Sequence, residues 1–181
     1  MAEKSAVQES YIRAAGAVAF VAIIDANGEE GIGSAFHIGD GIFVTARHVV
    51  DGVTIKDIAT TKSVHLSEEA GGKTTPPREL KIVDGPYFGP DGLDVAVFRV
   101  DVGTAPLPAI TVSQHTDYSL DENDLVLSDI LIISYPPIPF TTIPSQVVTL
   151  GQINAVVRVR HSPVLQREHH SLTEPQENQR Q

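Results

Sequence analysis

Apolar and polar residues alternate along most of the chain, and clusters of glycine, asparagine, aspartate and proline separate the short apolar runs. A period of two with frequent turns predicts β-strands, and no helical pattern longer than two turns follows residue 15. Regularly spaced short strands of this kind predict a barrel or a sandwich. The predicted strands are 17–24, 34–38, 42–44, 63–66, 79–83, 93–100, 125–133, 146–150 and 153–159.

The first three predicted strands form a meander, because "DANGEEG" and "GDG" supply tight turns between them. A proline-rich segment, "VGTAPLPAITV", predicts a connector between two β units near residue 105. The last residues are rich in Gln, Glu and His and cannot bury enough apolar surface to become ordered. We therefore divide the chain into an extension 1–15, a first β unit 16–105, a second, partial β unit 106–160 and a disordered polar tail 161–181.

The composition excludes several classes of function. The chain has 13 Lys and Arg against 23 Asp and Glu, a net charge of −10, and no basic block, so a nucleic-acid partner is not expected. It has no cysteine, which excludes disulfides, zinc–thiolate sites and cysteine nucleophiles. The apolar run 14–24 is too short to span a membrane, and its mixed-charge flank does not resemble a signal peptide. A cytoplasmic location is favoured, with a periplasmic or secreted one left open.

The stretch "GIFVTARHVVDG" places His48 directly after a buried apolar run. A histidine that acts as a base needs a carboxylate to hold its second ring nitrogen. Asp94 is a candidate, since it begins "DVAVFRV" and is expected at the mouth of a buried strand. From the residues alone, a lone histidine after a strand is more often a satisfied core or surface residue than a metal ligand or a base, and an aspartate that starts a strand is often a turn residue.

The longer stretch "GIGSAFHIGDGIFVTARHVVDG" resembles the signature of trypsin-like serine proteases, particularly the cysteine-free bacterial type related to the Deg/HtrA proteases. "DGLDVAVFRVD" resembles the segment around the catalytic acid of that family, and the resemblance covers roughly residues 15–155. It implies an all-β, chymotrypsin-type double β-barrel. The first barrel, within 16–105, would be complete, and the second, within 106–160, incomplete.

The resemblance also implies a chemistry, peptide-bond hydrolysis through a Ser-His-Asp triad acting on a polypeptide substrate. In that mechanism His48 would be the general base and Asp94 the group that orients it. Thr45 and Ala46 would form the turn that aims His48 into the cleft between the barrels. In the second barrel "DILIISYP" and "VVTLGQINAV" resemble family strands, with Ser134 where glycine is common.

No nucleophile is identifiable, because the family places it in Gly-x-Ser-Gly-Gly and no serine of this sequence has those glycines. Ser34 follows Gly33 but precedes Ala35, and Ser171 lies at the expected distance but lacks every glycine. The serines are Ser5, Ser10, Ser34, Ser63, Ser67, Ser113, Ser119, Ser128, Ser134, Ser145, Ser162 and Ser171.

We therefore predict that the chain is inactive as written, and two interpretations stay open. It is a protease domain whose second barrel is cut short, with a replaced ending from about residue 161, or a non-catalytic homologue that binds peptides or proteins. An incomplete barrel would leave strand edges through which the chain could self-associate.

A metal site is the third class of function that we weigh. The tail carries His161, Glu168, His169 and His170, but their spacing does not converge three ligands, so a solvated polar tail is the better interpretation. No metal and no cofactor are expected. For His37, His65 and His115 no catalytic role is predicted.

Overall fold

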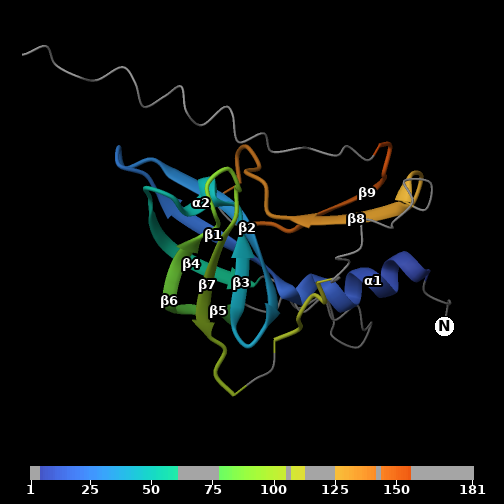
Figure 1. The fold of residues 1–181 in the computed structure, drawn as a ribbon, viewed down its shortest axis with the longest axis horizontal. Coiled ribbons are helices and arrows are strands. Elements are labelled where there is room, and N and C mark those ends of the chain that lie inside the picture. The colour runs from blue at the N-terminus through green and yellow to red at the C-terminus, as the bar shows by residue number, and fades with distance from the viewer. Residues whose placement is uncertain (1–4, 61–77, 105–106, 113–124, 142–143, 156–181) are drawn as a thin grey trace, which may run out of the picture.

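The structure, a computed structural model, describes residues 5–60, 78–104, 107–112, 125–141 and 144–155 (Figure 1). It is built mainly from antiparallel strands arranged in two sheets. The elements in chain order are α1 (Ala6–Ala14), η1 (Ala15–Ala17), β1 (Val18–Ile24), β2 (Glu30–Gly39), β3 (Ile42–Thr45), α2 (Arg47–Val50), β4 (Thr54–Thr60), β5 (Arg78–Glu79), β6 (Lys81–Phe88), β7 (Ala96–Asp101), β8 (Asp129–Ser134) and β9 (Val147–Gln152).

The larger sheet curls into the first barrel. Its strand order is β5-β4-β1-β2-β3-β7-β6, and only Leu80 separates β5 from β6 along the chain. One continuous run, 78–88, therefore pairs with β4 at its start and with β7 farther on. The amide of Leu80 donates to the carbonyl of Ile58 at 2.8 Å and extends the β4 pairing. This run joins the two edges of the sheet and closes the ring.

The barrel core is formed by inward-facing side chains, which occupy every second position along the strands. On β7 these positions are Ala96, Phe98 and Val100, all nearly inaccessible to solvent. Phe98 stacks on Phe43 of β3, with ring centroids 5.9 Å apart. Because side chains alternate across a strand, the same period of two that appears in the sequence puts these rings on one face.

The tight turn before β3 explains one glycine. Asp40 and Gly41 both have positive φ, 51° and 74°. A Cβ atom on Gly41 would lie 2.5 Å from the carbonyl oxygen of Val100, so only glycine fits there. The "GDG" turn predicted between the second and third strands is confirmed.

The smaller sheet is the hairpin of β8 and β9, paired from Asp129 with Gln152 to Ser134 with Val147. Tyr135, at the end of β8, is buried and packs edge-to-face on Phe20 of β1, with centroids 5.8 Å apart. Its amide donates to Oγ of Ser34 at 2.8 Å. Within the described residues, this hairpin is all that forms the second barrel, which agrees with the predicted fold class.

Several predicted elements need correction. Strand β4 was not predicted, and the strand predicted at 63–66 lies outside the described residues. Strand β7 begins at Ala96 and not at residue 93. The strand predicted at 153–159 is not present over 153–155, and its remainder lies outside the described residues.

Helix α1 was also missed. Ser5 caps it in a capping box with Gln8, and Tyr11 donates its hydroxyl to Oε1 of Gln146 at 3.1 Å. None of its residues is fully buried, but Val7, Tyr11 and Ala14 lie half-buried at helical spacing along one side. Among the described residues, no helix is long and apolar enough to cross a membrane.

Candidate active site

His48 lies on the short helix α2, which the end of β3 holds against β2. Thr45 is buried, and its hydroxyl donates to the carbonyl of Ser34 at 2.8 Å. A Cβ atom on Gly33 would lie 2.4 Å from Cγ1 of Val49, so α2 packs directly on the backbone of β2. These two contacts fix the turn that carries His48.

Asp94 lies in the loop between β6 and β7. The loop is closed at its base, where Phe88 pairs with Ala96 and the amide of Gly89 donates to the carbonyl of Val95 at 2.8 Å. Strand β3 pairs with β7, so the start of β7 lies beside the end of β3. This pairing brings Asp94 next to His48, from which it is separated by 46 positions in sequence.

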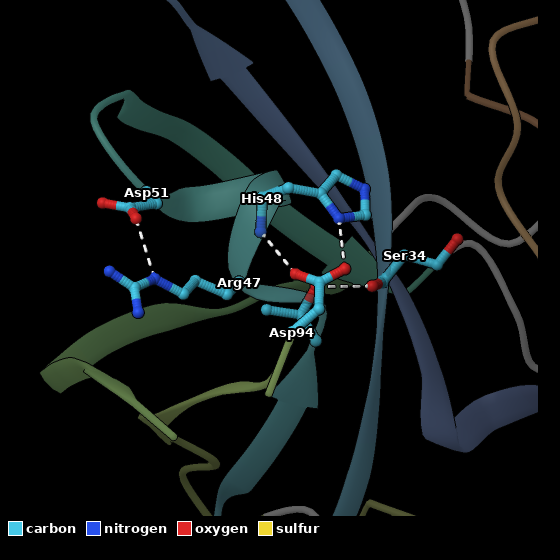
Figure 2. A network of polar contacts seen from close by, with 6 residues as sticks. Ser34, Arg47, His48, Asp51 and Asp94 are labelled. Carbon is cyan, nitrogen blue, oxygen red and sulfur yellow. Dashed lines mark hydrogen bonds and ion pairs between the residues drawn. The ribbon is translucent and has the colours of Figure 1, made fainter. Parts of the chain in front are cut away.

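Both oxygens of Asp94 contact His48 (Figure 2). Nδ1 of the His48 ring lies 2.6 Å from Oδ2, and the backbone N–H of His48 donates to Oδ1 at 2.9 Å. A carboxylate accepts hydrogen bonds, so Nδ1 carries the proton in the neutral ring and Nε2 is the acceptor. The ring is thereby held in one tautomer with Nε2 available as a base.

The same contacts perturb the carboxyl group. The backbone N–H of His48, followed by its ring, lowers the pKa of Asp94 below the ordinary value, and the backbone N–H of Arg47 adds to the effect. Hydrogen bonds therefore favour the ionised form of Asp94 at neutral pH.

The site is more open than the sequence predicts. The side chains are 73% exposed for His48 and 57% for Asp94. We expected Asp94 at the mouth of a buried strand, and this was wrong, because β7 begins two residues later. The low pKa of Asp94 thus arises from donated hydrogen bonds, and burial acts against it.

Ser34 is the serine nearest to His48 in the motif, but its hydroxyl has a structural partner. Its Oγ accepts the amide of Tyr135 at 2.8 Å. Figure 2 shows this hydroxyl directed away from His48. Ser171, the other serine considered, lies outside the described residues.

His37 is buried on β2 and serves the fold. Its Nδ1 donates to the carbonyl of Pro108 at 2.7 Å, and its Nε2 accepts the amide of Gly41 at 3.1 Å. The ring also stacks on Phe43, with centroids 5.1 Å apart. Both ring nitrogens are therefore occupied in the barrel, which leaves neither for catalysis.

The other histidines considered, His65, His115, His161, His169 and His170, lie outside the described residues, as does Glu168. Within the part that is described, no group of three or more side chains could hold a metal ion. A cavity of about 400 Å³ lies between the outer face of β1 and β2 and the loop around Pro136, and neither His48 nor Asp94 lines it.

A family model described as the trypsin-like peptidase domain matches residues 33–176. The chain belongs to the trypsin-like peptidase family. The match spans most of the sequence and includes the His48 and Asp94 segments. It confirms the resemblance drawn from the two motifs.

Solved structures support the fold. The trypsin-like chain is similar to the HtrA-type protease AlgW, solved with a tripeptide (22% identity, TM-score 0.55, covering 88% of this chain and 43% of that one). It is also similar to Deg5, with 20% identity and a TM-score of 0.56 over 90% of this chain and 69% of that one. A serine endoprotease from Yersinia pestis is 21% identical, with a TM-score of 0.52 over 85% of this chain and 46% of that one. The chain thus spans less than half of the length of AlgW. No curated protein matches the sequence significantly.

One part of this trypsin-like site was missed in the sequence. Nε of Arg47 donates to Asp51 at 2.8 Å, and the guanidinium carbon lies 5.0 Å from the centroid of the Phe88 ring. The spacing of four residues between Arg47 and Asp51 is a signal for an ion pair on a helix. Nothing local in the sequence points to Phe88, which the fold brings from β6.

Proposed function

We propose that this domain carries the general base and the orienting acid of a serine endopeptidase site, His48 and Asp94, and that polypeptides are its substrate class. The observation that carries the proposal is the 2.6 Å contact between Nδ1 of His48 and Oδ2 of Asp94, with Nε2 left as the acceptor. Family membership supplies the reaction class. The tripeptide in the AlgW structure supports a peptide as the ligand.

In this mechanism Nε2 of His48 takes the proton of an attacking hydroxyl while the hydroxyl oxygen bonds to the carbonyl carbon of the peptide. The imidazolium then gives that proton to the leaving amine, and the C–N bond breaks. Asp94 stays ionised throughout, holds the ring orientation and stabilises the positive charge. Its lowered pKa suits this role.

We further propose that this chain on its own does not hydrolyse peptide bonds. No serine in the sequence has the flanking glycines that form the nucleophile turn and the oxyanion hole. Loss of one oxyanion donor alone lowers kcat by about 10²–10³-fold in enzymes of this type. Peptide binding without cleavage is the alternative function, because the fold and the contact between His48 and Asp94 do not require a nucleophile.

The base can be tested without a serine. p-Nitrophenyl acetate is reactive enough for an imidazole to attack directly, so wild-type protein should hydrolyse it faster than His48→Ala, with Asp94→Ala in between. A variant with His161, His169 and His170 changed to glutamine controls for the three histidines of the 161–181 segment and should keep the rate. Equal rates for wild type and His48→Ala would contradict the assignment of His48 as an accessible base.

A further inference from the structure

Arg47 connects the two segments that carry His48 and Asp94. It precedes His48 in α2, where its Nε donates to Oδ2 of Asp51 at 2.8 Å. From there its guanidinium extends over the ring of Phe88, the last residue of β6, at 5.0 Å. In Figure 2 the Arg47 side chain points toward Asp51 while the His48 ring turns to the other side.

Phe88 stands at the base of the loop that carries Asp94. It pairs with Ala96, and the neighbouring amide of Gly89 bonds to the carbonyl of Val95. The loop is therefore a short closed segment whose position follows that of Phe88. A group that holds Phe88 against α2 therefore also keeps Asp94 in contact with His48.

The charge of Arg47 acts in the same direction. The pKa of its guanidinium is raised, first by the hydrogen bond and charge of Asp51 and further by Asp91 and Asp94. Asp91 and Asp94, both on this loop, make the smaller contributions to that rise. Arginine suits this position because its planar group can donate to a carboxylate and lie on an aromatic face at once.

We propose that Arg47 is a positioning residue, which clamps the Asp94 loop to α2 through Asp51 and Phe88 and so keeps the carboxylate on Nδ1 of His48. The inference rests on the proposed function of the His48–Asp94 pair. Arg47 touches no reacting atom in this account, and its effect passes through Asp94.

The tautomer of His48 tests this proposal, because it depends on where Asp94 lies and needs no turnover. Long-range ¹H–¹⁵N spectra of the full chain, at a pH where the ring is neutral, distinguish Nδ1–H from Nε2–H. His48→Gln assigns the signal, and Asp94→Ala gives the reference for a ring without its carboxylate. Arg47→Met keeps an unbranched apolar stem but removes the guanidinium.

We expect the Nδ1–H form in the wild type and, in Arg47→Met, a measurable shift toward the Asp94→Ala reference. The matched control is Lys56→Met, which removes one positive charge from a different exposed ion pair, Lys56–Glu30 at 2.6 Å. This control should keep the wild-type tautomer. Phe88→Leu, which removes the ring and keeps the charge, should shift it in the same direction as Arg47→Met.

An Arg47→Met spectrum like the wild type would overturn the proposal, and so would an equal shift in Lys56→Met. If Arg47→Met loses the amide dispersion of a folded sheet, Phe88→Leu decides by the same criteria. A wild type without the Nδ1–H form would instead overturn the proposed His48–Asp94 pair itself. Failure of the clamp and failure of the proposed function are thus distinguishable.

Discussion

Gly33 of β2 lies directly beneath Val49 of α2, so close that a Cβ atom at position 33 would fall 2.4 Å from Cγ1 of Val49. This contact explains the second glycine of the Gly-x-Gly-Ser motif, because any side chain there would push α2 away from the sheet. Since α2 carries His48, the glycine determines the height of the base above β2.

Gly33→Ala should therefore destabilise the protein by about 1–3 kcal/mol, the usual cost of overpacking a close contact. The free energy of unfolding in urea measures the loss. Val49→Ala in the Gly33→Ala background should recover part of it, because the methyl groups that collide are removed. Additive losses in the double variant would contradict a direct contact between the two positions.

Ser34→Ala should weaken the attachment of the hairpin, since it leaves the amide of Tyr135 without its acceptor. The expected cost is about 1–3 kcal/mol in urea unfolding, the penalty for a buried donor that loses its partner. Hydrolysis of p-nitrophenyl acetate should stay at the wild-type rate. A large loss of that activity would instead indicate that Ser34 takes part in the chemistry.

The hydrogen bonds to Asp94 should make the stability of the fold depend on pH. Because its pKa is lowered in the folded state, the ionised carboxylate stabilises the fold above the unfolded value of about 3.9, and this contribution is lost as the pH falls through the folded value. The difference in Tm between wild type and Asp94→Asn should be largest near neutral pH and should shrink in acid. Thermal unfolding from pH 7 to pH 3 measures it.

A useful comparison is Asp25→Asn. Hydrogen bonds from backbone amides, led by that of Glu29, lower the pKa of Asp25 as well, so its Tm difference should follow pH in the same way. Asp25→Asn should leave the His48 tautomer unchanged. A Tm difference for Asp94→Asn that widens in acid would contradict the assigned hydrogen bonds.

His37→Ala should cost much more stability than His48→Ala. The change leaves the amide of Gly41 and the carbonyl of Pro108 without partners and opens space beside Phe43, with an expected loss of roughly 2–5 kcal/mol. Urea unfolding of the two variants gives the comparison. Equal stabilities would contradict a stabilising role for the His37 side chain, since the backbone hydrogen bond from Ile110 to His37 remains in the variant.

The early strands could be predicted from the sequence because their turns carry strong signals. "DANGEEG" and "GDG" mark the ends of β1, β2 and β3, and the alternation between those turns is regular. Helix α1 was also predictable in principle, from the Ser5-x-x-Gln8 spacing of a capping box. Strand β4 was missed because Lys56 and Asp57 are adjacent polar residues that interrupt its alternation.

The surroundings of the site depend on contacts between distant residues. Leu93 and Val95 continue the alternation upstream of β7, yet they are 47% and 39% exposed, so the pattern misplaced Asp94 in a buried setting. The contact of Arg47 with Phe88 joins α2 to β6, and only the pairing of β7 with both β3 and β6 brings them together. The divisions near residues 15, 105 and 160, and self-association, stay predictions.

The central claim is that His48 and Asp94 form a general base with its orienting carboxylate but have no serine to activate. Labelling with a fluorophosphonate probe tests this claim most directly. Intact mass spectrometry of the full chain should detect no adduct in the wild type under conditions that label a trypsin control completely. His48→Ala should give the same result. One adduct on a single serine, formed by the wild type and lost in His48→Ala, would contradict the account.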